Sequence, residues 1–244
     1  MKVAILGASR GIGREIARHL AERHDDLVLL GRNEADLGAL AKDLQVRGAR
    51  SVLVVPCDLA DADSHDRALD AAWKAHGRVD AVVVTAGLFG TQEQLEADRA
   101  KLAAVLDVDF TKTILLCEAA RVRLLDQGGG KLVVFSSVAG DRGRKTVGLY
   151  GAAKAGLSHY LEALDHRYRA AGLVTVCVKP GFVRTGMTAG LKEPPFAGDP
   201  DQVAADVVKA MDAGVPMVYT PRIWQLVMLV IRFLPRFVMR RVGF

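Results

Sequence analysis

Residues 3–13 read VAILGASRGIG, a short apolar run followed at once by a turn that holds three glycines. The run predicts a buried strand, and the apolar periodicity beyond Gly13 predicts a helix. Glycines let a backbone turn tightly and approach a pyrophosphate, while the start of a helix offers free N–H groups and a positive dipole end. A tight turn without a ligand uses the same glycines, but the position between a strand and a helix favours a nucleotide site.

Apolar runs alternate with amphipathic segments along the rest of the chain. The runs are short and continuous, which is typical of strands covered on both faces, and they occupy Val3–Leu6, Leu27–Leu30, Val52–Val55, Ala81–Val84, Leu132–Phe135 and Val174–Val178. The helix-period segments occupy Ile12–Arg23, Glu34–Arg47, Asp63–His76, Arg99–Leu125 and Leu149–Ala171. This alternation predicts an α/β fold with a Rossmann-type, doubly wound parallel sheet. No linker or repeat divides the chain, so we predict one domain over residues 1–244.

Ligands of doubly wound sheets bind at the carboxyl ends of the strands, so the residues that follow each apolar run are the candidates for a site. The third run is followed by CDL at 57–59, and the fourth by TAG at 85–87. The fifth run leads into SSVAG at 136–140. The sixth is followed by PG at 180–181 and then by Thr185. We expect these segments to meet at one edge of the sheet.

Tyr150 and Lys154 stand four residues apart in a predicted helix, so they share one helix face. Alone, such a pair is usually solvated surface, but this one follows SSVAG and precedes PG. A phenol with a pKa near about 10 is a poor acid–base catalyst at neutral pH. A neighbouring ammonium favours the phenolate and lowers that pKa. We therefore expect Lys154 to lie beside Tyr150 and to tune it for catalysis.

The order of these motifs resembles the short-chain dehydrogenase/reductase family over the whole chain. The resemblance implies a nicotinamide dinucleotide and hydride transfer between it and a carbonyl or alcohol. It implies that Ser137, Tyr150 and Lys154 are catalytic, with Ser137 holding the substrate oxygen. The residues that it places around the cofactor are Gly7, Ser9, Arg10, Gly11, Ile12, Gly13, Arg32, Asp58, Leu59, Ala86, Gly87, Tyr150, Lys154, Pro180, Gly181, Val183 and Thr185.

The sequence departs from the family pattern at three positions. Leu6 stands where the family has Thr, and Thr85 stands where it has Asn. Asp109 occupies the place of the family's fourth catalytic residue, an Asn, and an ionised carboxylate cannot donate a hydrogen bond. We include Asp109 among the catalytic candidates and leave three interpretations open. It kinks the helix and holds a proton-relay water near Lys154, it slows proton exchange, or it marks a degenerate site.

The end of the second strand indicates which nicotinamide binds. NAD sites usually place a carboxylate there to hold the ribose 2′-hydroxyl, but this strand ends in Gly31 and Arg32. Arg10 adds a second guanidinium from the glycine turn. Two arginines suit the 2′-phosphate of NADP through charge-assisted hydrogen bonds, although both residues also fit an ordinary surface. We therefore predict NADP, used as NADPH, rather than NAD.

The formal net charge of +5 is concentrated in the last segment of the chain. No acidic residue follows Asp212, and the arginines beyond it are Arg222, Arg232, Arg236, Arg240 and Arg241. The residues between them are mostly Leu, Val, Ile, Met, Phe and Trp, which predicts a helix that lies in a lipid interface and kinks at Pro235. The alternative is a helix packed on the body or on a partner subunit. Polar interruptions exclude a membrane span, and the scarcity of stacking groups argues against nucleic acid.

The three cysteines, Cys57, Cys117 and Cys177, are far apart in apolar surroundings. They have neither metal-ligand spacing nor the arrangement of a disulfide framework, so we expect buried or half-buried thiols and no metal. The first residues run straight into a strand without a signal-peptide pattern. These features predict a cytoplasmic protein, with peripheral attachment to the inner face of the membrane if the tail binds lipid.

Further strings resemble decaprenylphosphoryl 2-keto-ribose reductases and their bacterial relatives. They are ILGAS at 5–9, GLFG at 87–90, SSVAGDRGRK at 136–145, VKPGFVRTGMTAGLKEPPF at 178–196, and YTPRIW and IRFLPRFVMRR in the tail. Those reductases act on a keto-sugar carried on a polyprenyl phosphate. The resemblance implies NADPH-dependent reduction of a ketone to a secondary alcohol on a lipid-linked or other apolar substrate.

Two other functions remain open at this stage. A 3-ketoacyl or 3-ketosphinganine type reductase would use the same catalytic residues, whereas a non-catalytic cofactor-binding regulator is motivated by Asp109 alone. We expect a substrate lid at about 181–200, because this glycine- and proline-rich stretch follows the sixth strand at the edge where substrate enters. We treat 222–244 as the basic apolar tail, and we expect a homo-oligomer.

Overall fold

Seven parallel strands form one sheet in the computed structural model, which describes residues 1–243. The strand order is β3-β2-β1-β4-β5-β6-β7. The strands are β1 (Lys2–Leu6), β2 (Asp26–Gly31), β3 (Ser51–Pro56), β4 (Ala81–Val84), β5 (Gly130–Phe135), β6 (Leu173–Pro180) and β7 (Met217–Thr220). Because β1 lies between β2 and β4, the order reverses there, and a doubly wound sheet binds its ligand beside such a reversal.

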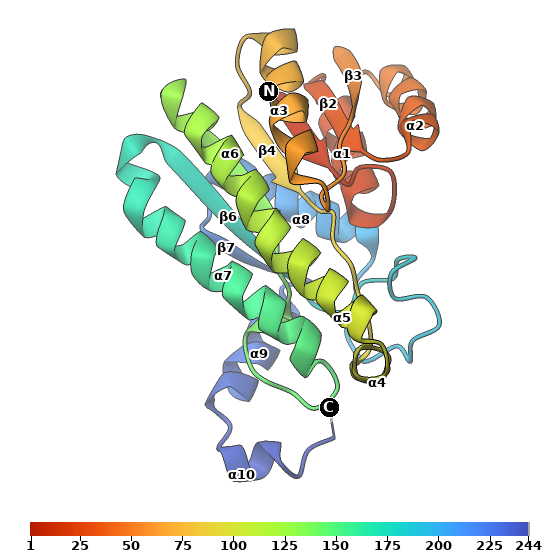
Figure 1. Ribbon diagram of the computed structural model, residues 1–244, viewed down its shortest axis with the longest axis vertical. Helices are drawn as coiled ribbons and strands as arrows, with labels where there is room; N and C mark the ends of the chain where they lie inside the picture. Colours follow the sequence, from red (N-terminus) through yellow and green to blue (C-terminus); the bar gives the residue numbers. More distant parts are fainter. Residues whose placement is uncertain (244) are drawn as a thin grey trace.

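Helices cover both faces of the sheet (Figure 1). The helices of one face are α1 (Gly11–Glu22), α2 (Glu34–Val46) and α8 (Pro200–Ala213). The other face carries α3 (Ala62–His76), α6 (Thr113–Asp126) and α7 (Gly148–Tyr168). Shorter elements are α4 (Gln92–Ala97), α5 (Arg99–Leu106), η1 (Asp107–Lys112), η2 (Val138–Gly140) and η3 (Arg169–Ala171). The chain ends with α9 (Ile223–Phe233) and α10 (Arg236–Met239).

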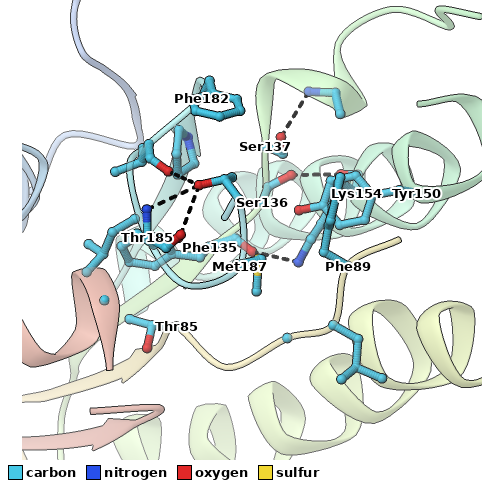
Figure 2. A pocket seen from close by; sticks show the side chains of 18 of the residues that line it. Thr85, Phe89, Phe135, Ser136, Ser137, Tyr150, Lys154, Phe182, Thr185 and Met187 are labelled. Atoms are coloured by element: carbon cyan, nitrogen blue, oxygen red, sulfur yellow. Dashed lines mark hydrogen bonds between the residues drawn. The ribbon is translucent and has the colours of Figure 1, made fainter. Parts of the chain in front are cut away.

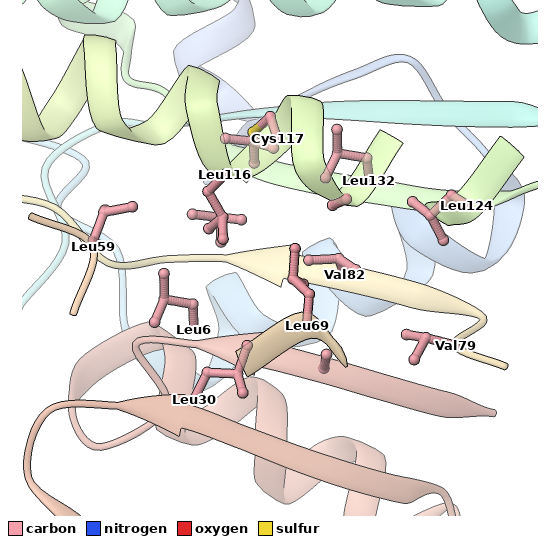
Figure 3. Packing of buried hydrophobic residues seen from close by; sticks show 14 of the residues in the cluster. Leu6, Leu30, Leu59, Leu69, Val79, Val82, Leu116, Cys117, Leu124 and Leu132 are labelled. Carbon is pink, nitrogen blue, oxygen red and sulfur yellow. The ribbon is translucent and has the colours of Figure 1, made fainter. Parts of the chain in front are cut away.

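Successive strand residues point into two separate cores, as the pleat of a buried strand requires. Leu6, Leu30 and Val82 face the α3–α6–α7 layer, where they pack with Leu69 and Leu116 (Figure 3). Their neighbours along each strand face α1, α2 and α8 instead. This double burial explains why the strands are continuous apolar runs without polar alternation.

The strand register brings the carboxyl ends of the strands into line. Leu6 pairs with Leu30 on one side and with Val84 on the other, and Phe135 pairs with Val178. The segments that follow these residues therefore emerge at one edge of the sheet, as the sequence predicted.

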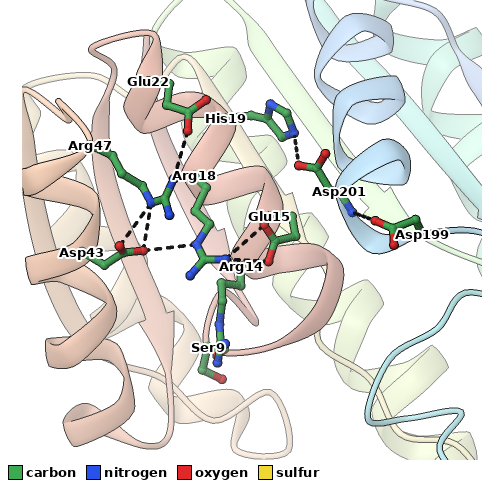
Figure 4. Close-up of polar contacts among 10 residues, drawn as sticks. All are labelled: Ser9, Arg14, Glu15, Arg18, His19, Glu22, Asp43, Arg47, Asp199 and Asp201. Atoms are coloured by element: carbon green, nitrogen blue, oxygen red, sulfur yellow. Dashed lines mark hydrogen bonds and ion pairs between the residues drawn. The ribbon is translucent and has the colours of Figure 1, made fainter.

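Ion pairs on the surface join α1 to its neighbours (Figure 4). Arg18 of α1 contacts Asp43 of α2 at 3.2 Å, and His19 contacts Asp201 of α8 at 2.8 Å. Exposed pairs of this kind contribute about 0–1 kcal/mol each, so the apolar layers beneath them stabilise the arrangement more.

Two parts of the fold differ from the sequence-based expectation. The single helix expected over Arg99–Leu125 is divided by the π-helical turn η1, which contains Asp109. The strand β7 and the helix α8 were not predicted. Met217 of β7 is exposed and the strand ends in Tyr219 and Thr220, so it lacks the continuous apolar run that marked the others.

Candidate active site

The glycine turn after β1 is tied to the end of β4 by Thr85. Its hydroxyl donates hydrogen bonds to the carbonyl oxygens of Leu6 and Gly7, both at 3.1 Å. Gly7 has φ +96°, and a Cβ there would come within 2.5 Å of Thr85 Oγ1. Only glycine fits this backbone and this contact. Thr85, which replaces the family's Asn, therefore fixes the shape of the turn.

The start of α1 fits the phosphates of a dinucleotide. Arg10 precedes the helix, and its side chain makes no capping hydrogen bond. The first N–H groups of α1 therefore have no side-chain acceptor, and they lie beside residues that line a large cavity. An uncapped helix start behind a glycine turn is the arrangement that binds pyrophosphate.

One cavity of about 1530 Å³ runs along the carboxyl edge of the sheet. All the residues predicted to surround the cofactor line it, from Gly7 in the glycine turn to Thr185 beyond β6. Ser137 lines it as well. Drug-sized ligands occupy about 300–1,000 Å³, so this volume has room for a dinucleotide together with a substrate.

A smaller hollow beside the glycine turn holds the two arginines expected to recognise NADP. Arg10 and Arg32 line it, and so do Glu34 and Asp36. Arg10 contacts Asp36 Oδ2 at 3.3 Å. Asp36 was not predicted from the sequence, because α2 brings it back toward the turn. A 2′-phosphate would have to compete with this carboxylate for Arg10.

Ser136 joins the end of β5 to α7, a role that the sequence analysis did not assign. Its hydroxyl donates to Lys154 O at 2.8 Å and lies 2.7 Å from Ser158 Oγ (Figure 2). Ser137 Oγ accepts a hydrogen bond from Ala139 N at 3.1 Å. The two serines therefore have different roles. The Ser136 hydroxyl holds α7 against the end of β5, and Ser137 lies at the cavity wall.

Tyr150 and Lys154 lie together on the first turns of α7, as their spacing predicted. Lys154 Nζ is 5.7 Å from the centroid of the Tyr150 ring and donates to Phe135 O at 3.1 Å. Phe89 packs edge-on against Tyr150, with the ring centroids 5.1 Å apart (Figure 2). Aromatic packing and the lysine hydrogen bond fix both side chains at the cavity.

The electrostatic setting of Tyr150 differs from the expectation. Burial and the negative charge of Asp109 raise the pKa of the Tyr150 phenol, and only a hydrogen bond from Ser137 lowers it. Lys154 does not dominate because its ammonium already faces a counter-charge, with Asp109 Oδ2 at 3.7 Å. The Asp109 carboxylate thus opposes the lowering of the Tyr150 pKa that was predicted from Lys154.

Asp109 lies behind the cavity wall. It is fully buried in η1, and its Oδ1 accepts a hydrogen bond from Leu88 N at 2.7 Å. Burial raises the pKa of this carboxyl, while Lys154 and the Leu88 N–H act in the opposite direction. A Cβ on Gly87 would come within 2.8 Å of Asp109 Oδ1, which shows how closely the β4 loop covers it. Asp109 contacts Lys154 and does not line the cavity, unlike the other catalytic candidates.

One face of α9 belongs to the body of the protein. Trp224, Met228 and Ile231 form a small core with Val138 and Tyr219. The packed-tail alternative therefore holds for this face, and the helix ends before Pro235, where the kink was expected. None of the helices in residues 1–243 is both long enough and apolar enough to cross a bilayer.

The rest of α9 and the following turn face two environments. Val227, Val230 and Leu234 line the cavity. Leu226 and Phe233 are 62% and 77% exposed. The tail thus forms part of the cavity wall and also presents apolar side chains to solvent.

The segment expected to be a lid, 181–200, also lines the cavity. It contains Met187 and Phe196, whose side chains are about half exposed, and its ends meet in a bridge between Val183 and Gly198. Trp224 Nε1 donates to Phe196 O at 3.1 Å. The segment and α9 therefore contact each other at the cavity wall.

A dinucleotide-sized cavity beside the switch point, with a glycine turn at one end and Ser137, Tyr150 and Lys154 at the other, defines a class of nicotinamide-dependent oxidoreductases. Residues 1–195 match the short chain dehydrogenase family, and the chain belongs to that family. It is an NAD(P)-dependent short-chain dehydrogenase/reductase.

The relatives in sequence carry the same general description. An uncharacterized oxidoreductase of Mycobacterium tuberculosis is 34% identical over 239 residues, which are 98% of this chain and 96% of the relative. An uncharacterized oxidoreductase of Streptomyces coelicolor is 35% identical over 242 residues, 97% and 94% of the two chains. Carbonyl reductase family member 4 of Xenopus tropicalis is 28% identical over 218 residues, 86% and 90% of the two chains.

Solved structures share the fold at low sequence identity. A short-chain dehydrogenase from Sphingobium yanoikuyae in complex with NADPH superposes with a TM-score of 0.81 at 24% identity, over 91% of this chain and 88% of that one. A variant of actinorhodin polyketide ketoreductase with NADPH gives 0.80 at 23% identity, over 90% and 95%. These likenesses confirm the Rossmann-type fold.

Proposed function

We propose that this protein is an NADPH-dependent reductase that converts an apolar, lipid-linked ketone to a secondary alcohol. The observation that carries the proposal is the meeting of Ser137, Tyr150 and Lys154 at one end of the cavity, against a wall that is largely apolar. The narrower likeness to decaprenylphosphoryl 2-keto-ribose reductases supports a keto-sugar on a polyprenyl phosphate as the substrate.

Each residue of the site has a separate role in the proposed reaction. Bound NADPH would supply the hydride for the carbonyl carbon. The Ser137 and Tyr150 hydroxyls hold the substrate oxygen, and Tyr150 donates its proton to that oxygen. The phenol of Tyr150 is protonated at neutral pH, as a proton donor requires, while its raised pKa makes it a weaker acid than a free phenol. Lys154 stabilises the phenolate that remains, and Asp109 positions Lys154.

Arg10 and Arg32 support the choice of NADPH. Both side chains are exposed beside the glycine turn, where the adenosine ribose of a dinucleotide would lie. A guanidinium pair binds a phosphate through directed, charge-assisted hydrogen bonds. Asp36 would turn from Arg10 or remain as a competing acceptor, so Arg32 is the main determinant of the preference.

The tail supports a substrate that is presented at a lipid surface. Exposed apolar side chains of α9 and α10 lie beside five arginines, and the same helix lines the cavity. We propose that this face rests on an anionic membrane, peripheral to the inner leaflet, with the 181–200 segment as the lid. We also propose a homo-oligomer, because α6 presents Leu115 and Val122 to solvent at 46% and 43% exposure.

A turnover screen tests the proposal. The protein is incubated with NADPH and either lipid-linked keto-sugars or 3-keto lipids, and alcohol formation is followed. Reduction of the keto-sugars supports the leading proposal, and reduction of the 3-keto lipids alone supports a 3-ketoacyl or 3-ketosphinganine type reductase. If neither these nor any activated ketone exchanges hydride, the protein is a cofactor-binding regulator and the proposal is wrong.

A further inference from the structure

Residues 141–147, between η2 and α7, carry four charged side chains, and three of them are engaged within the protein. Asp141 accepts hydrogen bonds from a buried lysine of β6 and a tyrosine of β7, both at 2.6 Å. Arg142 donates to the carbonyl after α9 at 2.9 Å, and Lys145 donates to the carbonyl after α10 at 2.6 Å. These contacts hold the segment against the tail.

Arg144 is the exception. Its side chain makes no hydrogen bond and no ion pair with any residue in 1–243, and its Nε is shielded from solvent without a partner. Burial lowers the pKa of the Arg144 guanidinium, and the nearest opposing influence is Asp141, which is already paired. A partly buried cation without a counter-ion is unfavourable, so a native site of this kind is expected to meet its anion in a ligand.

The cavity around Arg144 indicates what the ligand looks like. Arg144 lines it, and Val227, Val230 and Leu234 of the tail line it as well. Lys192 adds a second, exposed cation to the lining. Glu93 also lines the cavity, but hydrogen bonds from its own backbone and from Thr91 hold its pKa below the usual range. That carboxylate is satisfied at the start of α4 and leaves Arg144 without a partner.

We propose that Arg144 binds an anionic group, a phosphate or a carboxylate, that the substrate of this cavity carries. The guanidinium fork matches the paired oxygens of either group, and the tail side chains cover the adjoining apolar chain. The proposal deepens the proposed function and rests on it, because it assigns the charge class of the same substrate. Arg144 is then a specificity residue, since it lies on the segment that joins Ser137 to Tyr150.

Binding of simple amphiphiles tests the proposal without any turnover. The protein is saturated with NADP, so that Arg10 and Arg32 are occupied, and is titrated by calorimetry with decyl phosphate, decanoate and decanol below their micelle concentrations. We expect one or both anions to bind at least about 10-fold more tightly than decanol. Comparison of the two anions distinguishes a phosphate from a carboxylate.

Two variants assign the preference to its residue. Arg144→Gln is expected to lose the preference for the anion and to bind decanol as the wild type does. Lys145→Gln removes the same charge from the same segment and is expected to keep the preference. Arg144→Lys keeps the charge without the planar guanidinium, so its preference for the anion should lie between those of the other two variants. It also replaces Arg144→Gln as the test if the Gln variant does not fold.

Equal binding of all three probes by the wild type, or a preference that survives in Arg144→Gln, would overturn the proposal. Loss of ketone reduction alone would not affect it.

Discussion

Burial raises the pKa of Tyr150 most, and the negative charge of Asp109, which is paired with Lys154, raises it further. The charged atoms of Asp109 and Lys154 are 3.7 Å apart, and neither side chain is more than 6% exposed. The Asp109 carboxylate repels the phenolate. An acidic residue at this place therefore favours the protonated form of Tyr150 and weakens it as an acid.

The exchange Asp109→Asn is expected to move the pH dependence of reduction. Removing the negative charge lowers the pKa of Tyr150, because Asp109 raises it. Tyr150 acts as an acid in reduction, so activity falls as pH rises through its pKa, and a lower pKa shifts that fall to lower pH. Activity at neutral pH should be similar or higher. The measurement is kcat/KM against pH, and an unchanged profile or a shift to higher pH would contradict this role.

The exchange Arg32→Ala is expected to reduce the preference for NADPH. Loss of a charge-assisted hydrogen bond to an exposed phosphate should weaken NADPH binding about 10-fold or more and leave NADH nearly unchanged. Affinity for both cofactors is measured by titration. Lys74→Ala, a loss of one exposed cation on α3, is the control. An NADPH/NADH affinity ratio that stays at the wild-type value in Arg32→Ala would show that the phosphate binds elsewhere.

At the scale of elements, the sequence motifs predicted most of the site residues at the carboxyl edge of the sheet. The remaining residues reach the site only through tertiary packing. The glycine turn, SSVAG and Tyr-xxx-Lys were found where the sequence placed them, because each follows a buried strand or shares a helix face. Asp36 and Arg144 escaped prediction, since their importance comes from segments that only tertiary packing brings to the cavity. The π-helical turn at Asp109 also leaves no periodic signal in the sequence.

The 181–200 segment is expected to close over bound ligand. Residues 181–199 contain no regular helix or strand, and they line the cavity beside α9. Amide hydrogen exchange in this segment should slow when cofactor and a substrate analogue bind, whereas exchange in the buried strand β1 should not change. Equal exchange of the segment with and without ligand would show that it is a fixed wall.

The tail is expected to bind vesicles that contain anionic lipid. Apolar burial gives the attraction, and each arginine near the surface adds about 1 kcal/mol. The charge reversals Arg232→Glu and Arg236→Glu together should weaken sedimentation with such vesicles by at least about 10-fold, and salt should weaken the wild type. Lys74→Glu with Arg99→Glu reverses two exposed charges elsewhere and is the control. Vesicle binding that is equal in both double variants would exclude the tail as the membrane contact.

At the scale of the whole molecule, one continuous cavity joins three regions that are distant in sequence. The glycine turn and Thr85 form its cofactor end, α7 brings the catalytic candidates, and the tail closes the substrate side. The docked face of α9 explains why this tail is part of the enzyme body, while its exposed face remains available to a lipid surface. The residues assigned to cofactor, chemistry and substrate thus all line one cavity along the carboxyl edge of a single sheet.

The central claim is that this cavity reduces a ketone with Tyr150 as the proton donor. The most direct test follows NADPH oxidation with an apolar ketone that the wild type turns over, in the wild type and in Tyr150→Phe, together with the affinity of each for NADPH. The account predicts that the Phe variant loses about 10²- to 10⁴-fold in kcat and binds NADPH with nearly the wild-type affinity. A Phe variant that binds NADPH and retains the wild-type kcat would contradict it.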